Sequence, residues 1–378
     1  MSTRSHRLIV FALFFVLAPA LSRGQGGREG EDDTKNEPLR DTRDRPLPSG
    51  EDDSSSSTQL AGPGLGMIFD HVRGGLRPIL GLPGAAIMGG VVELGSELTQ
   101  SWISPRHEYA LGRLKDDPGL VLLHLDRGAL SAEPIPGTIP GVTRIALSPA
   151  GASAILYGGE TRRAQLVRGL PSSPSVVVEV DLSQLPDSVG PLAVSDDAGA
   201  ALFFVSEGES GTLYAITANG GLKWVSAAEE VLGISFLAHR QDALIADRRA
   251  NTILLIRDAA GAAGKSVFVA EQDGIQNPVA VQISDDQRRV FVANSGSASV
   301  SVLDLNGGPP TQIPCSRVPS GLYRLAGSSL FRLTEFSQAP LLLLDGGADE
   351  PRIFFIPPPV EPQPETETPA ETSKSEAH

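Results

Sequence analysis

The sequence of 378 residues predicts an all-β fold, a β-propeller in which seven blades are favoured, six are possible, and each blade has four antiparallel strands. Two observations lead to this fold. Short segments rich in valine, isoleucine and leucine alternate with turns of glycine, asparagine, aspartate and serine. A unit of about 45 residues also recurs along the middle of the chain, and this period with four short strands per unit is typical of propellers.

The clearest copy of the unit runs from Pro278 to Leu305. We expect strands at 279–283, 289–293 and 299–303, separated by a Ser-Asp-Asp turn and an Asn-Ser-Gly turn. The same order recurs in weaker copies, and equivalent turn positions follow one another at steps of 42 to 47 residues; these positions are Ser104, Ser148, Ser195, Leu237, Ser284 and Gly327.

Such units should close into a ring because a single four-stranded sheet has two faces to bury and cannot bury them alone. The innermost strand of each unit can be small and apolar, as 142–147, 231–236 and 278–283 are. The outermost strand should be wetter and less regular, as 311–314 is.

The two ends of the repeat region differ from the rest. Segments 66–70 and 76–80 resemble the third and fourth strands of a unit that has no first half. The last unit, between 322 and 356, holds four strands of its own. We therefore expect seven blades, one of which is incomplete or irregular.

Neither end of the sequence should belong to the propeller, which we place at 65–356. Residues 1–22 read as a secretory signal, with Arg4 and Arg7 before an apolar run and a small-residue cleavage pattern. Residues 23–64 form an acidic linker, and residues 357–378 form a tail rich in proline and glutamate; both should be disordered. The expected location is the periplasm or the extracellular space, with no membrane span in the mature chain.

The segment 278–305 resembles the YVTN-type and NHL-type propeller repeats, a group that includes lactonase-like propellers. The matching pieces are Pro278-Val-Ala-Val, Ser284-Asp-Asp, Val290-Phe-Val-Ala-Asn294 and Ser299-Val-Ser-Val-Leu-Asp304. The match is good over about 30 residues and thin over the other units. The resemblance implies blades and says little about chemistry.

Composition excludes several classes of function. The net charge of -14 argues against nucleic acid as a partner, since phosphate binding needs clustered lysine and arginine. The single cysteine, Cys315, allows no intramolecular disulfide. The histidines have no metal-binding spacing, and no serine-nucleophile elbow or phosphate-binding loop is present. Trp102 and Trp224 are the only tryptophans, so stacking platforms for sugars are scarce.

Ligands of propellers usually meet one end of the central channel, where loops join the second strand to the third and one blade to the next. Segment 158–174 is predicted as a long loop of this set, and its three arginines suggest an anionic ligand. The candidate binding residues in these loops are Arg162, Arg163, Arg168, Glu207, Asp247, Arg248, Glu271, Asn294 and Glu335.

The favoured function is an exported, non-catalytic propeller that binds a protein or an anionic ligand, acts as a monomer and needs no cofactor. The alternative is a lactonase-like hydrolase whose loop carboxylates and amides hold Ca²⁺ or Mg²⁺. Metal-dependent propeller lactonases typically carry Pro-Asn-Gly before the innermost strand, whereas this chain has Asn277-Pro278-Val279. In the Ser-Asp-Asp turns at 195–197 and 284–286, the serine and aspartate side chains should bond to nearby backbone N–H groups and so stabilise the turns.

Overall fold

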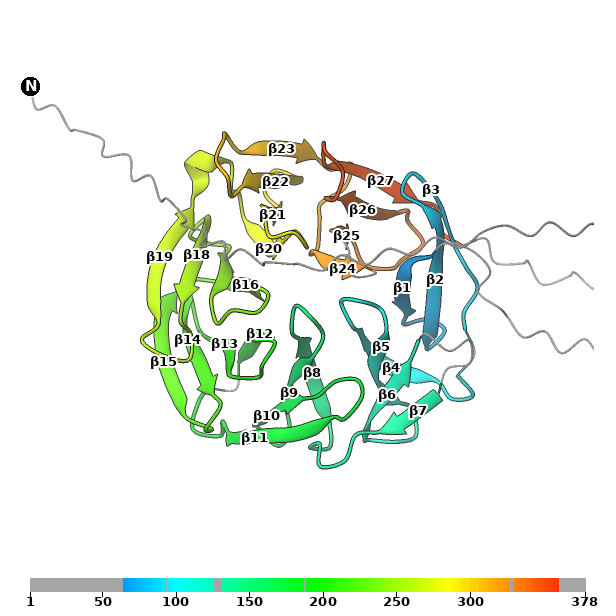
Figure 1. Ribbon diagram of the computed structural model, residues 1–378, viewed down its shortest axis with the longest axis vertical. Coiled ribbons are helices and arrows are strands. Elements are labelled where there is room, and N and C mark those ends of the chain that lie inside the picture. Colours follow the sequence, from blue (N-terminus) through cyan, green and yellow to red (C-terminus); the bar gives the residue numbers. More distant parts are fainter. Residues whose placement is uncertain (1–63, 93, 126–130, 187, 326–328, 360–378) are drawn as a thin grey trace, which may run out of the picture. The chain divides into compact units, whose positions relative to one another are not determined.

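The computed structural model describes residues 64–92, 94–125, 131–186, 188–325 and 329–359. These residues form strands β1 to β27 and a single-turn 3₁₀ helix, η1 (Glu271–Asp273). The strands pair into seven antiparallel sheets that stand as blades around a central axis (Figure 1). The all-β, seven-bladed prediction is therefore confirmed. The predicted signal at 1–22, the linker up to residue 63 and the tail from residue 360 lie outside the residues described.

Blades are numbered in chain order, and within each blade the strands run from the axis outward in sequence order. The first blade has three strands, β1 (Gly64–Asp70), β2 (Gly75–Leu82) and β3 (Ala85–Met88). The second has β4 (Leu98–Ile103), β5 (Tyr109–Leu114), β6 (Leu120–His124) and β7 (Ser131–Pro134), and the third has β8 (Val142–Leu147), β9 (Ser153–Gly158), β10 (Arg163–Arg168) and β11 (Ser175–Asp181). The fourth has β12 (Val189–Val194), β13 (Ala200–Glu207), β14 (Ser210–Thr217) and β15 (Leu222–Ala228).

The fifth blade has β16 (Val231–Phe236), β17 (Ala243–Asp247), β18 (Thr252–Arg257) and β19 (Gly264–Val269). The sixth has β20 (Pro278–Ile283), β21 (Arg289–Asn294), β22 (Ser299–Asp304) and β23 (Thr311–Pro314), and the seventh has β24 (Tyr323–Leu325), β25 (Leu330–Arg332), β26 (Leu341–Asp345) and β27 (Arg352–Ile356). The strands expected around the clearest repeat and the four strands expected in the last unit are all present.

The hydrophobic core is divided into seven clusters, and each cluster lies between two neighbouring blades. Strand β13 shows why. Ala201 and Phe203 face the third blade, whereas Leu202 and Phe204 face the fifth, because successive side chains of a strand point to opposite faces of the sheet. Burial of a side chain such as Phe203 contributes about 1.5–3 kcal/mol, and it requires the neighbouring blade to be present.

The ring closes between the seventh and the first blade by side-chain packing. Ile68 and Ile79 of the first blade pack in one cluster with Leu330, Leu343 and Ile356 of the seventh. Within the residues that the structure places, no sheet combines strands from both ends of the chain. Among the described residues, the first and seventh blades therefore meet at this seam through apolar side chains.

The first blade corrects one prediction about strand order. Segments 66–70 and 76–80 were expected to be third and fourth strands, but β1 lines the channel, and β3 lies outside β2. Among the residues described this sheet has three strands, so it is the incomplete blade that the sequence predicts. The two segments pair as the expected hairpin; sequence pattern alone did not show that a further strand covers its outer edge.

Segment 158–174 corrects a second prediction, which was that these residues form one long loop. It is not one long loop, because residues 163–168 form β10, which pairs with β9 on one side and β11 on the other. Two turns, at 159–162 and 169–174, remain. Arg163 and Arg168 consequently lie at opposite ends of one strand and cannot share one rim of the ring.

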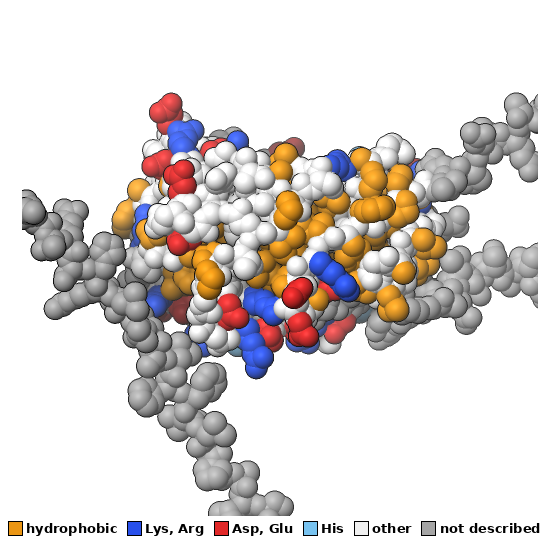
Figure 2. Space-filling view, turned by 90° about the horizontal axis from the view of Figure 1, so that it is seen from above, with side chains coloured by type: hydrophobic (Ala, Val, Ile, Leu, Met, Phe, Trp, Pro, Cys, Tyr) orange, Lys and Arg blue, Asp and Glu red, His pale blue; other side chains and the backbone are white. Residues whose placement is uncertain are grey.

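The outer wall of the ring carries exposed apolar side chains. The edge-on view in Figure 2, seen from the side of β23 and β27, shows them gathered over one half of that wall. The large exposed side chains of outermost strands include Trp224, Val267 and Phe355. These strands have a neighbour on one edge only, and their outward residues face solvent.

Candidate functional site

The central channel holds a cavity with a volume of about 660 Å³. The innermost strands of the second to seventh blades line it, together with β1 of the first blade. Cavities of this size are typical of sites for small organic ligands. The channel is therefore the candidate functional site.

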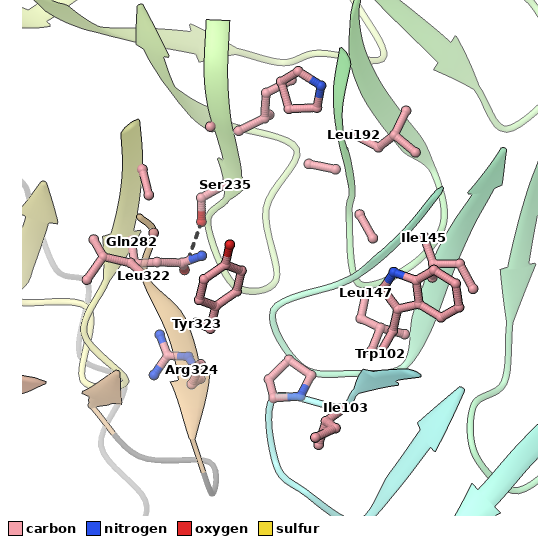
Figure 3. Close-up of a pocket in the computed structure, with 18 of the residues that line it drawn as sticks. Trp102, Ile103, Ile145, Leu147, Leu192, Ser235, Gln282, Leu322, Tyr323 and Arg324 are labelled. Atoms are coloured by element: carbon pink, nitrogen blue, oxygen red, sulfur yellow. Dashed lines mark hydrogen bonds between the residues drawn. The ribbon is translucent and has the colours of Figure 1, made fainter. Parts of the chain in front are cut away.

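The wall of the channel has an apolar side and a polar side (Figure 3). Strands β4, β8 and β12 supply the apolar side, with Trp102, Ile103, Ile145, Leu147 and Leu192. Strands β16, β20 and β24 supply the polar side, with Ser235, Gln282, Tyr323 and Arg324. The Ser235 hydroxyl donates to Oε1 of Gln282 over 3.2 Å. A ligand that fits both sides has an apolar body and a polar edge.

The charged groups on the channel wall are cationic. Arg144, Arg324 and Arg332 line the cavity, and no aspartate or glutamate is among its lining residues. This is opposite to the chain as a whole, whose net charge is -14. Arg144 on β8 is exposed and has no ion pair among the placed residues. The channel thus offers at least one open guanidinium to an anion.

The other two guanidinium groups are engaged by neighbours. Arg332 lies 4.2 Å from the ring centroid of Tyr323, and its Nη1 is 2.6 Å from Oε2 of Glu335. Burial and the nearby Glu335 carboxylate raise the pKa of Tyr323 to about 12, so its phenol is neutral at neutral pH. Arg324 lies 4.9 Å from the ring centroid of Phe331 and donates to the carbonyl of Ile283.

His107 joins three blades at the seam of the ring. It lies in the turn between β4 and β5, and its Nδ1 accepts the N–H of Met67 in β1 over 2.7 Å. Its Nε2 lies 3.4 Å from the carbonyl oxygen of Arg324 in β24. Burial lowers the pKa of His107 to about 4, so the ring is neutral and can act as this acceptor. Gly66 is required beside it: its φ is 134°, and a Cβ there would approach Cε1 of His107 to 2.6 Å.

Two of the predicted binding residues accept hydrogen bonds from backbone N–H groups. Asp247 and Asn294 end the second strands of the fifth and sixth blades and are 3% and 0% exposed. Asp247 accepts the N–H groups of Glu229 and Glu230, and Asn294 accepts that of Gln276. Each side chain therefore holds the connection that enters its own blade.

The remaining predicted residues are spread over four blades and the connection into the sixth. Several are paired: Arg163 with Glu179 at 2.6 Å, Arg248 with Glu230 at 3.4 Å, and Glu335 with Arg332. Arg162 donates to the carbonyl of Leu185, Glu271 lies in η1, and Glu207 and Arg168 are exposed strand ends. None of the nine residues lines the channel.

The turn chemistry expected of the serine and aspartate residues is confirmed. Ser284 Oγ accepts the N–H groups of Arg288 and Arg289 and donates to Asp286 over 2.5 Å. Ser195 makes the same bonds to Ala200 and Asp197. The Ser284 hydroxyl lowers the pKa of Asp286, which stabilises the charged form within the turn.

Sequence reasoning missed the channel wall itself. Trp102 and Arg144 lie on innermost strands, and nothing in their local pattern marks them as site residues. The available signal was their position in the repeat, because every innermost strand borders the axis. An arginine or a tryptophan at such a position stands out against the small apolar residues of the other copies.

No group of three or more histidine, cysteine, aspartate or glutamate side chains in the described part of the chain is placed to hold a metal ion. Burial raises the pKa of the Cys315 thiol to about 11, which keeps it protonated at neutral pH. No helix in this part of the chain is long and apolar enough to cross a membrane.

The fold and the site define a seven-bladed β-propeller with an open central channel. No known family matches the chain, and no curated protein matches it. Solved structures with the same fold include a functionally unknown protein from Desulfotomaculum acetoxidans, with TM-score 0.52 and 12% identity over 79% of this chain and 100% of that chain. A protein from Lactobacillus plantarum gives TM-score 0.51 and 14% identity over 78% and 96%. These similarities concern the fold alone.

Proposed function

We propose that this protein is an exported binding module whose central channel holds a small organic anion with an apolar body. The observation that carries the proposal is the channel of about 660 Å³, lined by apolar side chains and arginines without any carboxylate, in a chain of net charge -14. Export rests on the secretory signal expected at 1–22, and the site does not depend on it.

Arg144 is the anchor we propose for the anionic group. Arg144 lines the cavity from β8, the strand that also carries Ile145 and Leu147, so a bound ligand can pair its charge with Arg144 and pack its body on the apolar wall. A hydrogen bond to a charged group contributes about 1.5–3 kcal/mol, which corresponds to about tenfold or more in affinity.

The two tryptophans allow a direct test by fluorescence. Trp102 lines the channel, whereas Trp224 is 61% exposed on the outer wall. In a Trp224→Phe background, Trp102 becomes the only tryptophan and reports on the channel. We would titrate this variant with 1-naphthoate and, as a matched neutral probe, with 1-naphthamide. The expected result is saturable quenching by the carboxylate and binding at least about tenfold weaker by the amide.

Two arginine variants test whether the ligand binds in the channel or at the binding residues predicted from the sequence. Arg144→Gln should weaken naphthoate binding about tenfold. Arg168→Gln removes another exposed arginine, one that does not line the channel, and should leave binding unchanged. Equal affinity for the two probes, or loss of binding in Arg168→Gln alone, would refute the proposal. The hydrolase alternative with a loop-held divalent ion is addressed by elemental analysis of the purified protein.

A further inference from the structure

Glu335 neutralises one of the three arginines that line the channel. Its Oε2 lies 2.6 Å from Nη1 of Arg332, and its side chain is 59% exposed, whereas that of Arg332 is 15% exposed. Arg332 is among the residues that line the cavity, and Glu335 is not. The pair therefore joins a cation of the channel wall to a carboxylate that lies outside the cavity.

Neighbouring groups hold the Arg332 side chain in place. Arg332 and Tyr323 are partners across strands β25 and β24, and the guanidinium lies 4.2 Å from the centroid of the Tyr323 ring. Nη1 donates to the carbonyl of Thr334 over 3.3 Å as well as to Glu335. Both bonds use Nη1, and within the described part of the chain Nε and Nη2 have no hydrogen-bond partner. Arg332 therefore keeps N–H donors for a further acceptor.

Arg332 and Arg144 belong to blades that lie across the channel from each other. Arg144 is on β8 of the third blade, and Arg332 is on β25 of the seventh. Three blades separate them in one direction around the ring and two in the other, which is the largest separation that seven blades allow (Figure 1). Both residues line the same cavity. A ligand that spans the channel therefore meets Arg144 at one end and Arg332 at the other.

A carboxylate of a ligand can take the place of Glu335 because the present pair is only partly buried. An ion pair with an exposed partner is weak, since water solvates the carboxylate well once the pair is broken. A carboxylate inside the channel is less hydrated, so its bonds to a guanidinium are stronger. While Glu335 remains in place, its charge offsets that of Arg332 and weakens the attraction of the channel for a second anionic group.

We propose that Arg332 is a second anion anchor of the channel and that Glu335 occupies it in the absence of ligand. The ligand class that uses both anchors is an apolar molecule with an anionic group at each end. One group binds Arg144, and the other replaces Glu335 on Arg332. This inference rests on the function proposed above, whose anchor is Arg144.

Two dianions of different length test the second anchor, each with a monoanionic control of the same shape. They are naphthalene-2,6-dicarboxylate and biphenyl-4,4′-dicarboxylate, and in each control a carboxamide replaces one carboxylate. We would titrate all four into the Trp224→Phe protein and follow the fluorescence of Trp102. Glu335→Gln should raise the affinity for at least one dianion about tenfold, and that for its control about twofold or less.

Two further variants show whether the gain comes from Arg332. Adding Arg332→Gln to Glu335→Gln should abolish the gain, because the guanidinium that Glu335 released is then absent. Glu179→Gln is the matched control, since Glu179 and Arg163 are also 2.6 Å apart and neither lines the channel. This variant should leave the affinities for all four probes unchanged.

The outcomes distinguish the second anchor from the function on which it rests. If Arg144→Gln weakens binding of the controls but Glu335→Gln leaves both dianions unchanged, the second anchor is wrong and the channel function stands. An equal gain for dianion and control also overturns the second anchor, since Glu335 then acts only through the general electrostatic field. If Arg144→Gln weakens none of the four probes, the proposed function fails together with this inference.

Discussion

The sixth and the first blade cap the end of one strand with different polar side chains. In the sixth blade Asn294, at the end of β21, is an uncharged cap that accepts from Gln276 N–H and donates to Ser301 Oγ over 2.8 Å. In the first blade Asp70 ends β1, and its Oδ2 lies 2.6 Å from Nε of Arg77. The comparison teaches that a polar side chain at a strand end takes its partners from the segments packed around it.

Loss of the charged Asp70 side chain should lower the unfolding free energy more than loss of the uncharged Asn294 side chain. Asp70 is 1% exposed; burial acts to raise its pKa, but hydrogen bonds from Arg77, Arg73 and Val72 outweigh it and lower the pKa. Asp70→Ala leaves the Arg77 guanidinium buried without its carboxylate, and we expect a loss of about 3–5 kcal/mol in unfolding free energy. Urea denaturation followed by circular dichroism measures this.

An exposed ion pair is the control for that experiment. Lys115 and Glu97 lie 2.5 Å apart, and both side chains are 61% exposed. Glu97→Ala should cost about 1 kcal/mol or less. If Asp70→Ala costs no more than Glu97→Ala, the first blade does not depend on its buried pair.

The seam next to the first blade should be sensitive to acid. His107 has a folded pKa of about 4 against an ordinary 6.5, so the unfolded chain takes up a proton more readily. Stability is therefore fully present above about pH 6.5 and is lost as the pH falls through about 4, by as much as about 3 kcal/mol. Thermal unfolding between pH 7 and 4 measures the slope.

A histidine variant isolates the contribution of this one group. His107→Gln keeps an acceptor for Met67 N–H but does not titrate, so its stability should fall less steeply over the same pH range. Equal slopes in the wild type and His107→Gln would assign the acid sensitivity to other groups.

The sixth blade should respond less than the first to loss of its cap. Asn294→Ala leaves Gln276 N–H and Ser301 Oγ without this partner, at a cost of about 1–3 kcal/mol. Asn294→Asp keeps the acceptor for Gln276 but loses the donor to Ser301, and should cost less than the alanine variant. A larger loss for Asn294→Ala than for Asp70→Ala would reverse the ranking of the two blades.

Sequence patterns predicted the blades well because the reasons for them are local. Alternation of apolar residues, the Ser-Asp-Asp turns and the period of about 45 residues each depend on neighbours close in sequence. The strands around Val279 and Val300 were placed to within one residue. The hairpin of the first blade was also found, but its position in the sheet depended on β3.

The residues that line the channel were not among those predicted from the sequence. Reasoning from loop position selected Asp247 and Asn294, which are buried caps, and Arg168, which lies at the other end of its strand from Arg163. It passed over Arg144 and Trp102, because an inward position on an innermost strand is visible only when the ring is closed.

The amino-acid sequence by itself determined the strands, the turns and the repeat of about 45 residues, since these follow from propensity and periodicity over short distances. Only the tertiary structure decided which face of each strand meets a neighbouring blade and which residues border the axis. It also decided which polar groups are buried, because these properties arise from packing between segments that are distant in sequence.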